Sequence, residues 1–238
     1  MQFVVIHGAW HRGELFEATA QPIRDAGHDV LLPTLLGNGA DDSRSVGLDE
    51  VITHTVDYFD SHNLQDVIVV GHSYAGMIIT GLADRIPDRI HRLVYWNAFV
   101  PLIGESLNDM VPPHYVALFD ELAQADGGVS LPFDIWRESF INDGSPELAQ
   151  STYDELLPHP YKTFSEKIKL SKNPADITVP KSYINCTEDT ALPHSLPWHP
   201  RLSERLGLFR LIQTAGSHEL CFTNPQLLGE CILQAAAD

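Results

Sequence analysis

The sequence has few cysteines, no long apolar run and no signal-peptide pattern. Its 3 cysteines, Cys186, Cys221 and Cys231, are an odd number, and their spacing fits neither a disulfide framework nor a zinc motif. We expect them to be buried, reduced thiols. No apolar run approaches the roughly 20 residues that cross a bilayer, and the first residues enter a strand-like run at once. These absences predict a cytoplasmic protein without a membrane span.

Basic residues are also scarce. Lys and Arg total 15 against 32 Asp and Glu, which gives a formal net charge of −17. This charge repels the phosphates of nucleic acids and anionic lipid surfaces, so we expect neither as a partner. An acidic composition commonly serves solubility, and it does not identify a substrate.

Apolar runs of strand length alternate with segments of helical period over much of the 238 residues. This rhythm predicts one α/β domain over residues 1–238, with a mainly parallel, doubly wound sheet covered on both faces. The expected strands are 3–6, 29–32, 66–70, 90–96, 181–186 and 209–213. The expected helices are 15–26, 48–62, 75–85, a helix near 202, and 225–235.

Residues 102–171 interrupt the alternation and are richer in Pro, Asp and aromatics, so we interpret them as a helical lid inserted into a core of 1–101 and 172–238. Short helices are expected at 115–123, 133–141 and 146–157. Aromatic side chains are frequent in the lid: Tyr115, Phe119, Phe133, Trp136, Phe140 and Tyr153. Core packing and substrate contact are equally open for each of them. Trp10 and Tyr74 are expected to approach from the core side.

The segment Gly71-His-Ser-Tyr-Ala-Gly76 follows an apolar strand directly and leads into a helix. A serine hydroxyl is a weak nucleophile and must be held exposed at a sharp turn, which requires small neighbours. This Gly-x-Ser-x-Gly context predicts Ser73 as a nucleophile rather than part of a plain strand-to-helix turn. The Tyr74 N–H, at the start of the helix, is then a donor for an oxyanion.

An acid and a histidine follow Ser73 in the order that this motif requires. Asp189 lies in an acidic loop after an expected strand, and we prefer it to its neighbour Glu188, which remains the alternative acid. His218 lies in the loop after the next strand and is the predicted base. Such loops lie at the carboxyl edge of a parallel sheet, where Ser73 is also expected.

The loop after the first strand, from His7 to His11, is expected to supply a second oxyanion donor, the Ala9 N–H. Gly8 lets the backbone approach the substrate. His7 and His11 have the i, i+4 spacing of a metal pair, but the segment is a loop containing Gly8 and lacks a nearby carboxylate with zinc-protease spacing, so we expect structural hydrogen bonds from both. We expect no metal and no organic cofactor.

Several motifs resemble one branch of the α/β-hydrolases, which contains plant hydroxynitrile lyases, plant methyl-ester esterases of the salicylate-binding type and bacterial esterases. They are His7-Gly-Ala-Trp-His11, Ala26-Gly-His28, Gly71 to Gly76, Trp96 to Pro101, Tyr183 to Asp189 with Leu192-Pro193, and Gly216-Ser-His218. The resemblance covers most of the chain and is weakest in the lid. It implies the α/β-hydrolase fold and, by resemblance alone, a homodimer.

Two positions distinguish the reactions within this branch. The lyases carry threonine or asparagine where this chain has Gly8, and the S-selective lyases carry lysine where it has Glu219. An acidic Glu219 would repel developing cyanide, whereas esterases of the branch share the glycine. We interpret Glu219 as structural or solvent-facing, with tuning of His218 or a preference for a cationic substrate as the alternative.

These features predict a carboxylic-ester hydrolase acting on a small methyl or aryl ester, lactone or carbamate through an acyl-enzyme on Ser73. The substrate pocket is expected to include Gly8, Trp10, Phe119, Trp136 and Glu219. A cofactor-free dioxygenase, a hydroxynitrile lyase and a ligand-binding receptor with a vestigial triad remain the alternatives.

Overall fold

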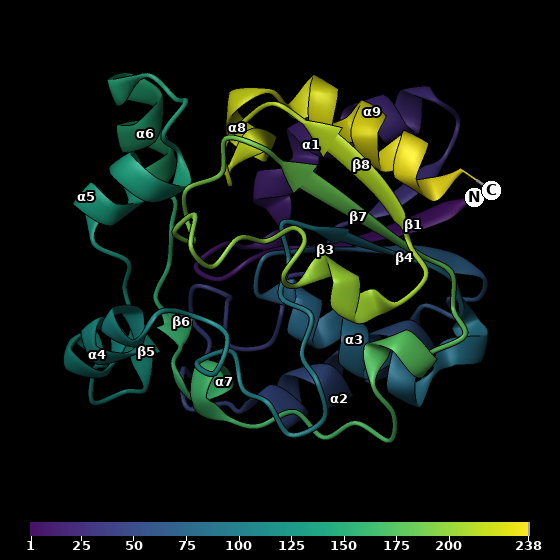
Figure 1. The fold of residues 1–238 in the computed structure, drawn as a ribbon, viewed down its shortest axis with the longest axis horizontal. Helices are drawn as coiled ribbons and strands as arrows, with labels where there is room; N and C mark the ends of the chain where they lie inside the picture. The colour runs from purple at the N-terminus through teal and green to yellow at the C-terminus, as the bar shows by residue number, and fades with distance from the viewer. Residues whose placement is uncertain (238) are drawn as a thin grey trace.

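Six parallel strands form one sheet in a computed structural model of the chain, which describes residues 1–237 (Figure 1). Asp238, the last residue of the expected domain, lies outside the described residues. The strands are β1 (Gln2–Ile6), β2 (Asp29–Leu31), β3 (Val67–His72), β4 (Ile90–Trp96), β7 (Lys181–Cys186) and β8 (Arg210–Thr214). Their order across the sheet is β2-β1-β3-β4-β7-β8.

Side chains alternate between the two faces of the sheet, and each face has its own apolar core. Val4 and Ile6 of β1 belong to one core cluster, whereas Phe3 and Val5 belong to the other. This period of two explains why the strand is apolar throughout, because both of its faces are buried.

Helices cover both faces of the sheet (Figure 1). On one side lie α1 (Glu17–Asp25), α8 (Leu220–Thr223) and α9 (Pro225–Ala236), and on the other lie α2 (Leu48–Ser61) and α3 (Ala75–Arg85). Short 3₁₀ helices occur at Gly13–Phe16, Pro87–Arg89, Pro174–Asp176 and Ser203–Leu206. The α/β-hydrolase fold predicted from the sequence is confirmed.

The strand order reverses at β1, which lies between β2 on one side and β3 on the other. The loops after β1 and β3 therefore leave the same edge of the sheet in opposite directions and open a crevice between them. Open parallel sheets bind ligands at such a switch point, beyond the carboxyl ends of the strands. The loop containing Ala9 and the turn containing Ser73 both lie at this position.

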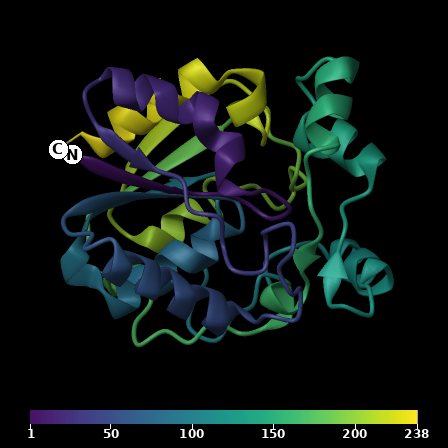
Figure 2. The same cartoon turned by 180° about the vertical axis from the view of Figure 1, so that it is seen from behind.

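The lid lies at the end of the molecule toward which the strands point (Figures 1 and 2). It contains α4 (Pro113–Leu122), β5 (Gly128–Val129), α5 (Phe133–Ile135), a π-helix (Trp136–Phe140), α6 (Pro146–Tyr153), β6 (His159–Pro160) and α7 (Lys162–Ser165). The antiparallel pair β5–β6 was not expected, because two-residue strands carry no periodic pattern. The expected helix at 133–141 changes to π geometry after Ile135, and the one at 146–157 ends at Tyr153.

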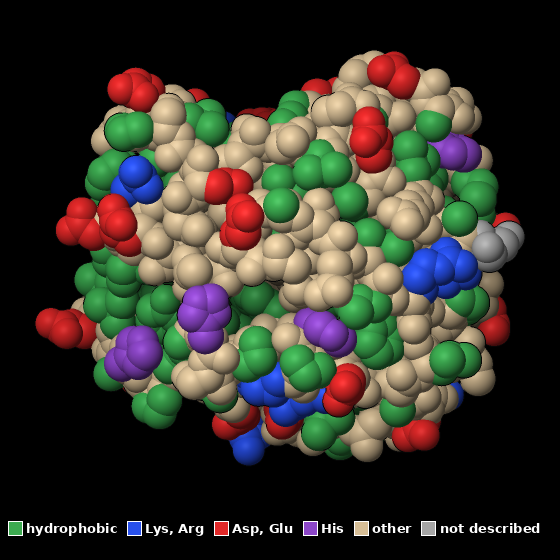
Figure 3. Space-filling view, turned by 45° about the horizontal axis from the view of Figure 1, so that its top comes forward, with side chains coloured by type: hydrophobic (Ala, Val, Ile, Leu, Met, Phe, Trp, Pro, Cys, Tyr) green, Lys and Arg blue, Asp and Glu red, His purple; other side chains and the backbone are tan. Residues whose placement is uncertain are grey.

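On the face shown in Figure 3, acidic side chains are dispersed among polar and apolar ones rather than gathered in one patch. The excess of negative charge is therefore spread as a solvated surface on this face. Among residues 1–237, every helix is too short or too polar to cross a bilayer.

Candidate active site

Ser73 lies at the sharp turn between β3 and α3. Its backbone φ is +53°, in the left-handed region that a residue with a side chain adopts only at a cost of about 1–3 kcal/mol. The turn is held by Ser73 N–H donating to Trp96 O at 3.1 Å and by Phe99 N–H donating to Ser73 O at 3.1 Å. At Gly76 a Cβ atom would lie 2.0 Å from Phe99 O, so only glycine allows the helix to start this close.

His218 and Asp189 are joined by a buried hydrogen bond. Nδ1 of His218 donates to Oδ2 of Asp189 at 2.6 Å. Because the proton is on Nδ1, the neutral ring has its lone pair on Nε2 and can accept a proton there. The ring lies between Trp198, stacked at 5.2 Å between centroids, and Phe140, edge-on at 5.2 Å. These contacts fix the plane of the imidazole.

Asp189 is held in place by two further donors. Ala191 N–H donates to Oδ1 at 2.8 Å, and the Asn97 side-chain amide donates to Oδ2. Asn97 is itself fixed, because its Oδ1 accepts from Cys186 N–H at 2.7 Å. No role was predicted for Asn97 from the sequence, although it directly follows β4 at the same edge of the sheet as Ser73. That position was the available signal.

Glu188, the alternative acid, lies elsewhere. Its Oε2 accepts from Gly216 N–H at 3.2 Å, and its own N–H donates to Gly216 O at 3.2 Å. Glu188 therefore fastens the loop that carries His218, while the structure brings Asp189 to the imidazole.

Burial and nearby negative charge shift the pKa of His218 in opposite directions. Burial lowers its pKa, but the charge of Asp189 and the hydrogen bond to it raise the pKa, with a smaller rise from Glu219, and the net pKa lies above the usual value. The neighbouring His72 has a pKa well below its usual value, because it is buried and close to other histidines. Protonation is thus favoured at His218 and opposed at His72.

The backbone N–H groups of Ala9 and Tyr74 border the same space as Ser73 and have no hydrogen-bond partner among residues 1–237. The loop of Ala9 is fixed on both sides. His11 Nδ1 donates to Ala9 O at 2.6 Å, and His7 Nδ1 donates to Gly8 O at 2.7 Å. Two free donors beside a serine suit an oxyanion.

Ser73 and His218 line a cavity with about 400 Å³ of empty space, a figure that includes the open solvent at its mouth. Its wall among the described residues contains no charged Asp, Glu, Lys or Arg side chain. The other lining residues are Ala9, Trp10, Tyr74, Phe99, Leu107, Val111, Tyr115, Phe119, Phe140, Phe164, Ala191, Leu192 and Trp198. We call this space the reactive cavity.

A model of the alpha/beta hydrolase family matches residues 3–228 of the chain. The chain belongs to the alpha/beta hydrolase family. The family resemblance inferred from the motifs is therefore confirmed.

Several relatives of this hydrolase carry more specific descriptions. A solved extracellular alpha/beta-hydrolase from a Paenibacillus species, described as sharing structural and functional homology with tobacco salicylic acid-binding protein 2, is 36% identical over 100% of both chains, with a TM-score of 0.95. The carbendazim hydrolyzing esterase of Nocardioides sp. (strain SG-4G) is 47% identical over 113 residues, or 46% of this chain and 47% of that one. Salicylic acid-binding protein 2 of Nicotiana tabacum is 25% identical over 98% of this chain and 96% of its own. These relatives support a hydrolase that acts on esters.

The structure brings only some of the expected pocket residues of this hydrolase to the reactive cavity. Trp10 and Phe119 line it, whereas Gly8, Trp136 and Glu219 are not among the described residues that do. Of the remaining lid aromatics, Tyr115 and Phe140 line the cavity, and Phe133 and Tyr153 pack against each other at 5.1 Å between centroids.

The three residues that differ from expectation have other surroundings. Trp136 donates its indole N–H to Ala149 O at 3.0 Å and packs within the lid. Gly8 lies beside Ser73, where an added Cβ would be 3.3 Å from the Ser73 Cβ. Glu219 is fully buried, so its interpretation as solvent-facing is wrong. It lies close to His11 and His72, with one nitrogen or oxygen atom of each within 4.8 Å of the others.

Proposed function

We propose that the chain is a carboxylic-ester hydrolase that works through an acyl-enzyme on Ser73. The observation that carries the proposal is that Ser73, His218, Ala9 and Tyr74 line one apolar cavity, that Asp189 is hydrogen-bonded to His218, and that the Ala9 and Tyr74 N–H groups are free among residues 1–237. Acyl transfer requires this set: a nucleophile, an oriented base and donors for the oxyanion.

The reaction begins with His218 neutral, with its proton on Nδ1 and its lone pair on Nε2. Nε2 accepts the Ser73 Oγ proton as Oγ attacks the ester carbonyl, and the Ala9 and Tyr74 N–H groups stabilise the resulting oxyanion. The proton on Nε2 then passes to the departing alcohol, which leaves the acyl group on Oγ. A water molecule, deprotonated by His218, attacks the acyl carbonyl and releases the carboxylic acid with Ser73 restored. Asp189 keeps the imidazole in the required tautomer and stabilises its charged form.

The cavity wall favours a small, uncharged and apolar or aromatic ester. Burying a charged substrate there without a partner would be unfavourable, since the described wall contains no charged side chain besides His218 when it is protonated. Methyl esters, aryl esters, lactones and carbamates all meet this condition, and the similarity to a carbendazim hydrolyzing esterase makes carbamates worth including.

Cyanide elimination has less support in this chain. A lyase of the resembling branch stabilises departing cyanide with a cation next to the catalytic histidine. Here that position holds Glu219, whose carboxylate is buried and does not border the reactive cavity. Hydrolysis needs no such cation.

A hydrolysis screen with Ser73→Ala as the control tests the proposal. We expect the wild type to cleave at least one short-chain aryl ester, methyl ester, lactone or carbamate, and to label at Ser73 with a fluorophosphonate probe. Ser73→Ala should reduce kcat about 10⁶-fold and abolish labelling. A folded protein that neither labels nor cleaves, but binds a ligand tightly, would instead be a receptor. Oxygen uptake on a hydroxylated heterocycle that persists in Ser73→Ala would indicate the dioxygenase.

A further inference from the structure

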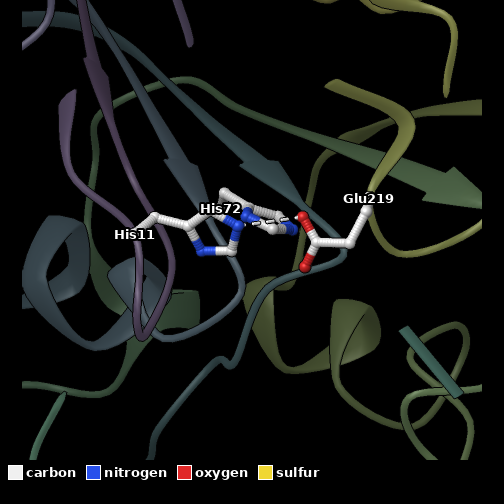
Figure 4. A group of neighbouring side chains, drawn as sticks. All are labelled: His11, His72 and Glu219. Carbon is white, nitrogen blue, oxygen red and sulfur yellow. Dashed lines mark ion pairs between the residues drawn. The ribbon is translucent and has the colours of Figure 1, made fainter. Parts of the chain in front are cut away.

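Three buried side chains converge on one point behind the reactive residues: His11, His72 and Glu219 (Figure 4). One ligand atom from each lies within 4.8 Å of the other two. The imidazole of His11 and the carboxylate of Glu219 approach to 3.1 Å between Nε2 and Oε2. All three side chains are removed from solvent, and none lines the reactive cavity.

The hydrogen bonds on the far side of both imidazoles fix which nitrogen carries a proton. His11 Nδ1 faces the carbonyl oxygen of Ala9 at 2.6 Å, and His72 Nε2 faces that of His218 at 3.1 Å. A carbonyl oxygen can only accept, so both of these nitrogens must donate. In the neutral rings, His11 Nε2 and His72 Nδ1 therefore present lone pairs toward the cluster.

The cluster thus gathers electron-pair donors without a matching positive group. Among the described residues, His11 Nε2, His72 Nδ1 and Glu219 Oε1 are buried and have no hydrogen-bond partner. Native proteins rarely leave several such atoms together, because each has lost its contact with water. A positive species at their centre would satisfy them.

We infer that His11, His72 and Glu219 form a structural site for one divalent transition-metal ion, for which zinc has the fitting ligand preference. Two imidazoles and one glutamate are a zinc ligand set known from sites in which a water molecule takes the fourth position, so the ion here would also need a buried water as its fourth ligand. Imidazoles that bind a metal also donate their other N–H to a carbonyl or carboxylate, as both rings do here. In a tetrahedral zinc site the ligand atoms lie about 3.3 Å apart, so the 3.1 Å contact between His11 and Glu219 fits, and His72 would have to move closer wherever its separation approaches the 4.8 Å limit.

A shared proton is the simpler alternative occupant of the cluster. A proton between His11 Nε2 and Glu219 Oε2 would satisfy these two atoms, but it would leave His72 Nδ1 and Glu219 Oε1 without a partner. A metal ion satisfies all three. This difference is the structural reason for preferring the ion.

The position of the site gives the ion a role that differs from hydrolysis. His72 precedes Ser73, Glu219 follows His218, and His11 holds the carbonyl of Ala9. The ion would tie together the three segments that carry the nucleophile, the base and the oxyanion loop. Because the site is closed to the reactive cavity, the ion braces these segments and does not activate a water molecule for hydrolysis.

Cobalt binding provides a readout that does not depend on activity. Untagged protein is unfolded with a chelator, refolded with Co²⁺ and desalted. We expect about one Co²⁺ per chain, a visible absorption band of low-symmetry Co²⁺, bleaching of this band by Zn²⁺, and a higher Tm than that of the metal-free protein. Glu219→Gln keeps the size of the side chain and should weaken binding about 100-fold or more, with loss of the band and of the gain in Tm.

The matched control is Glu230→Gln, the same change at an exposed position on α9, which should bind Co²⁺ like the wild type. Wild-type protein that retains no Co²⁺, or a Glu219→Gln variant that keeps the same band and affinity, would overturn the proposal. If Glu219→Gln does not fold, anomalous diffraction at the zinc edge from wild-type crystals grown with Zn²⁺ decides. A peak between the three side chains supports the site, and its absence overturns it.

Discussion

The two sides of the reactive residues have opposite chemistry. On one side of Ser73 and His218 lies the reactive cavity, whose wall is mainly apolar. Behind them lies the cluster of His11, His72 and Glu219, which is polar and closed. In the proposed function the apolar side would receive the substrate, and in the proposed metal site the polar side would hold the segments that carry Ser73 and His218.

The largest loss of activity should come from breaking the hydrogen bond between Asp189 and His218. Asp189→Asn removes the carboxylate that fixes the tautomer of His218, and we expect kcat to fall about 10⁴-fold with little change in fold, measured by steady-state ester hydrolysis and circular dichroism. Glu188→Gln is the matched control at the neighbouring acid, and its kcat should stay close to that of the wild type. Equal losses in both variants would contradict the assignment of Asp189.

A side chain at Gly8 should disturb the packing between Ser73 and His72, which lie on either side of it. In Gly8→Ala the new Cβ would lie 2.8 Å from His72 Nδ1, and that ring is stacked on Trp96 at 3.8 Å between centroids and cannot easily yield. We expect the free energy of unfolding to fall by about 1–3 kcal/mol in urea titration, together with a loss of activity. Unchanged stability and activity would show that the space beside His72 is looser than in this structure.

The smallest effect should come from a change in the wall of the reactive cavity, and it should appear mainly in KM. Phe119→Ala removes a lining side chain, and we expect KM for an aryl ester to rise about tenfold with kcat less affected. Phe133→Ala is the matched control, because Phe133 lies in the same lid but packs against Tyr153. A similar rise in KM for both variants would mean that the lid aromatics act together rather than through the cavity wall.

Local patterns predicted the sheet and the nucleophile turn. The apolar runs of strands such as Val67–His72 and the Gly-x-Ser-x-Gly sequence are local features of the chain, so a sequence contains them directly. The choice between Asp189 and Glu188 could be stated but not settled from local pattern, because both follow the same strand. Asn97, which holds Asp189, shows its role only when β4 and β7 are placed side by side.

Contacts between segments far apart in the chain could not be predicted from sequence patterns. Trp136 and Phe119 are both lid aromatics, yet only Phe119 reaches the reactive cavity, since the fold of the lid decides the direction of each side chain. His11 was paired with His7 by spacing, but His7 Nε2 accepts from Leu35 N–H, and His11 meets Glu219 from the far end of the chain. Burial, which no local pattern indicated, also changes the interpretation of Glu219.

The insertion of the lid as a single stretch between β4 and β7 has an evolutionary consequence. Ser73, Asp189 and His218 all lie outside residues 102–171, whereas much of the cavity wall comes from within them. If Ser73, Asp189 and His218 act as proposed, a gene that exchanges or diversifies this one segment would change the cavity wall and keep these three residues. Diversity of substrate among descendants should therefore accumulate in the lid, and a laboratory library restricted to it would explore new esters at little risk to the chemistry.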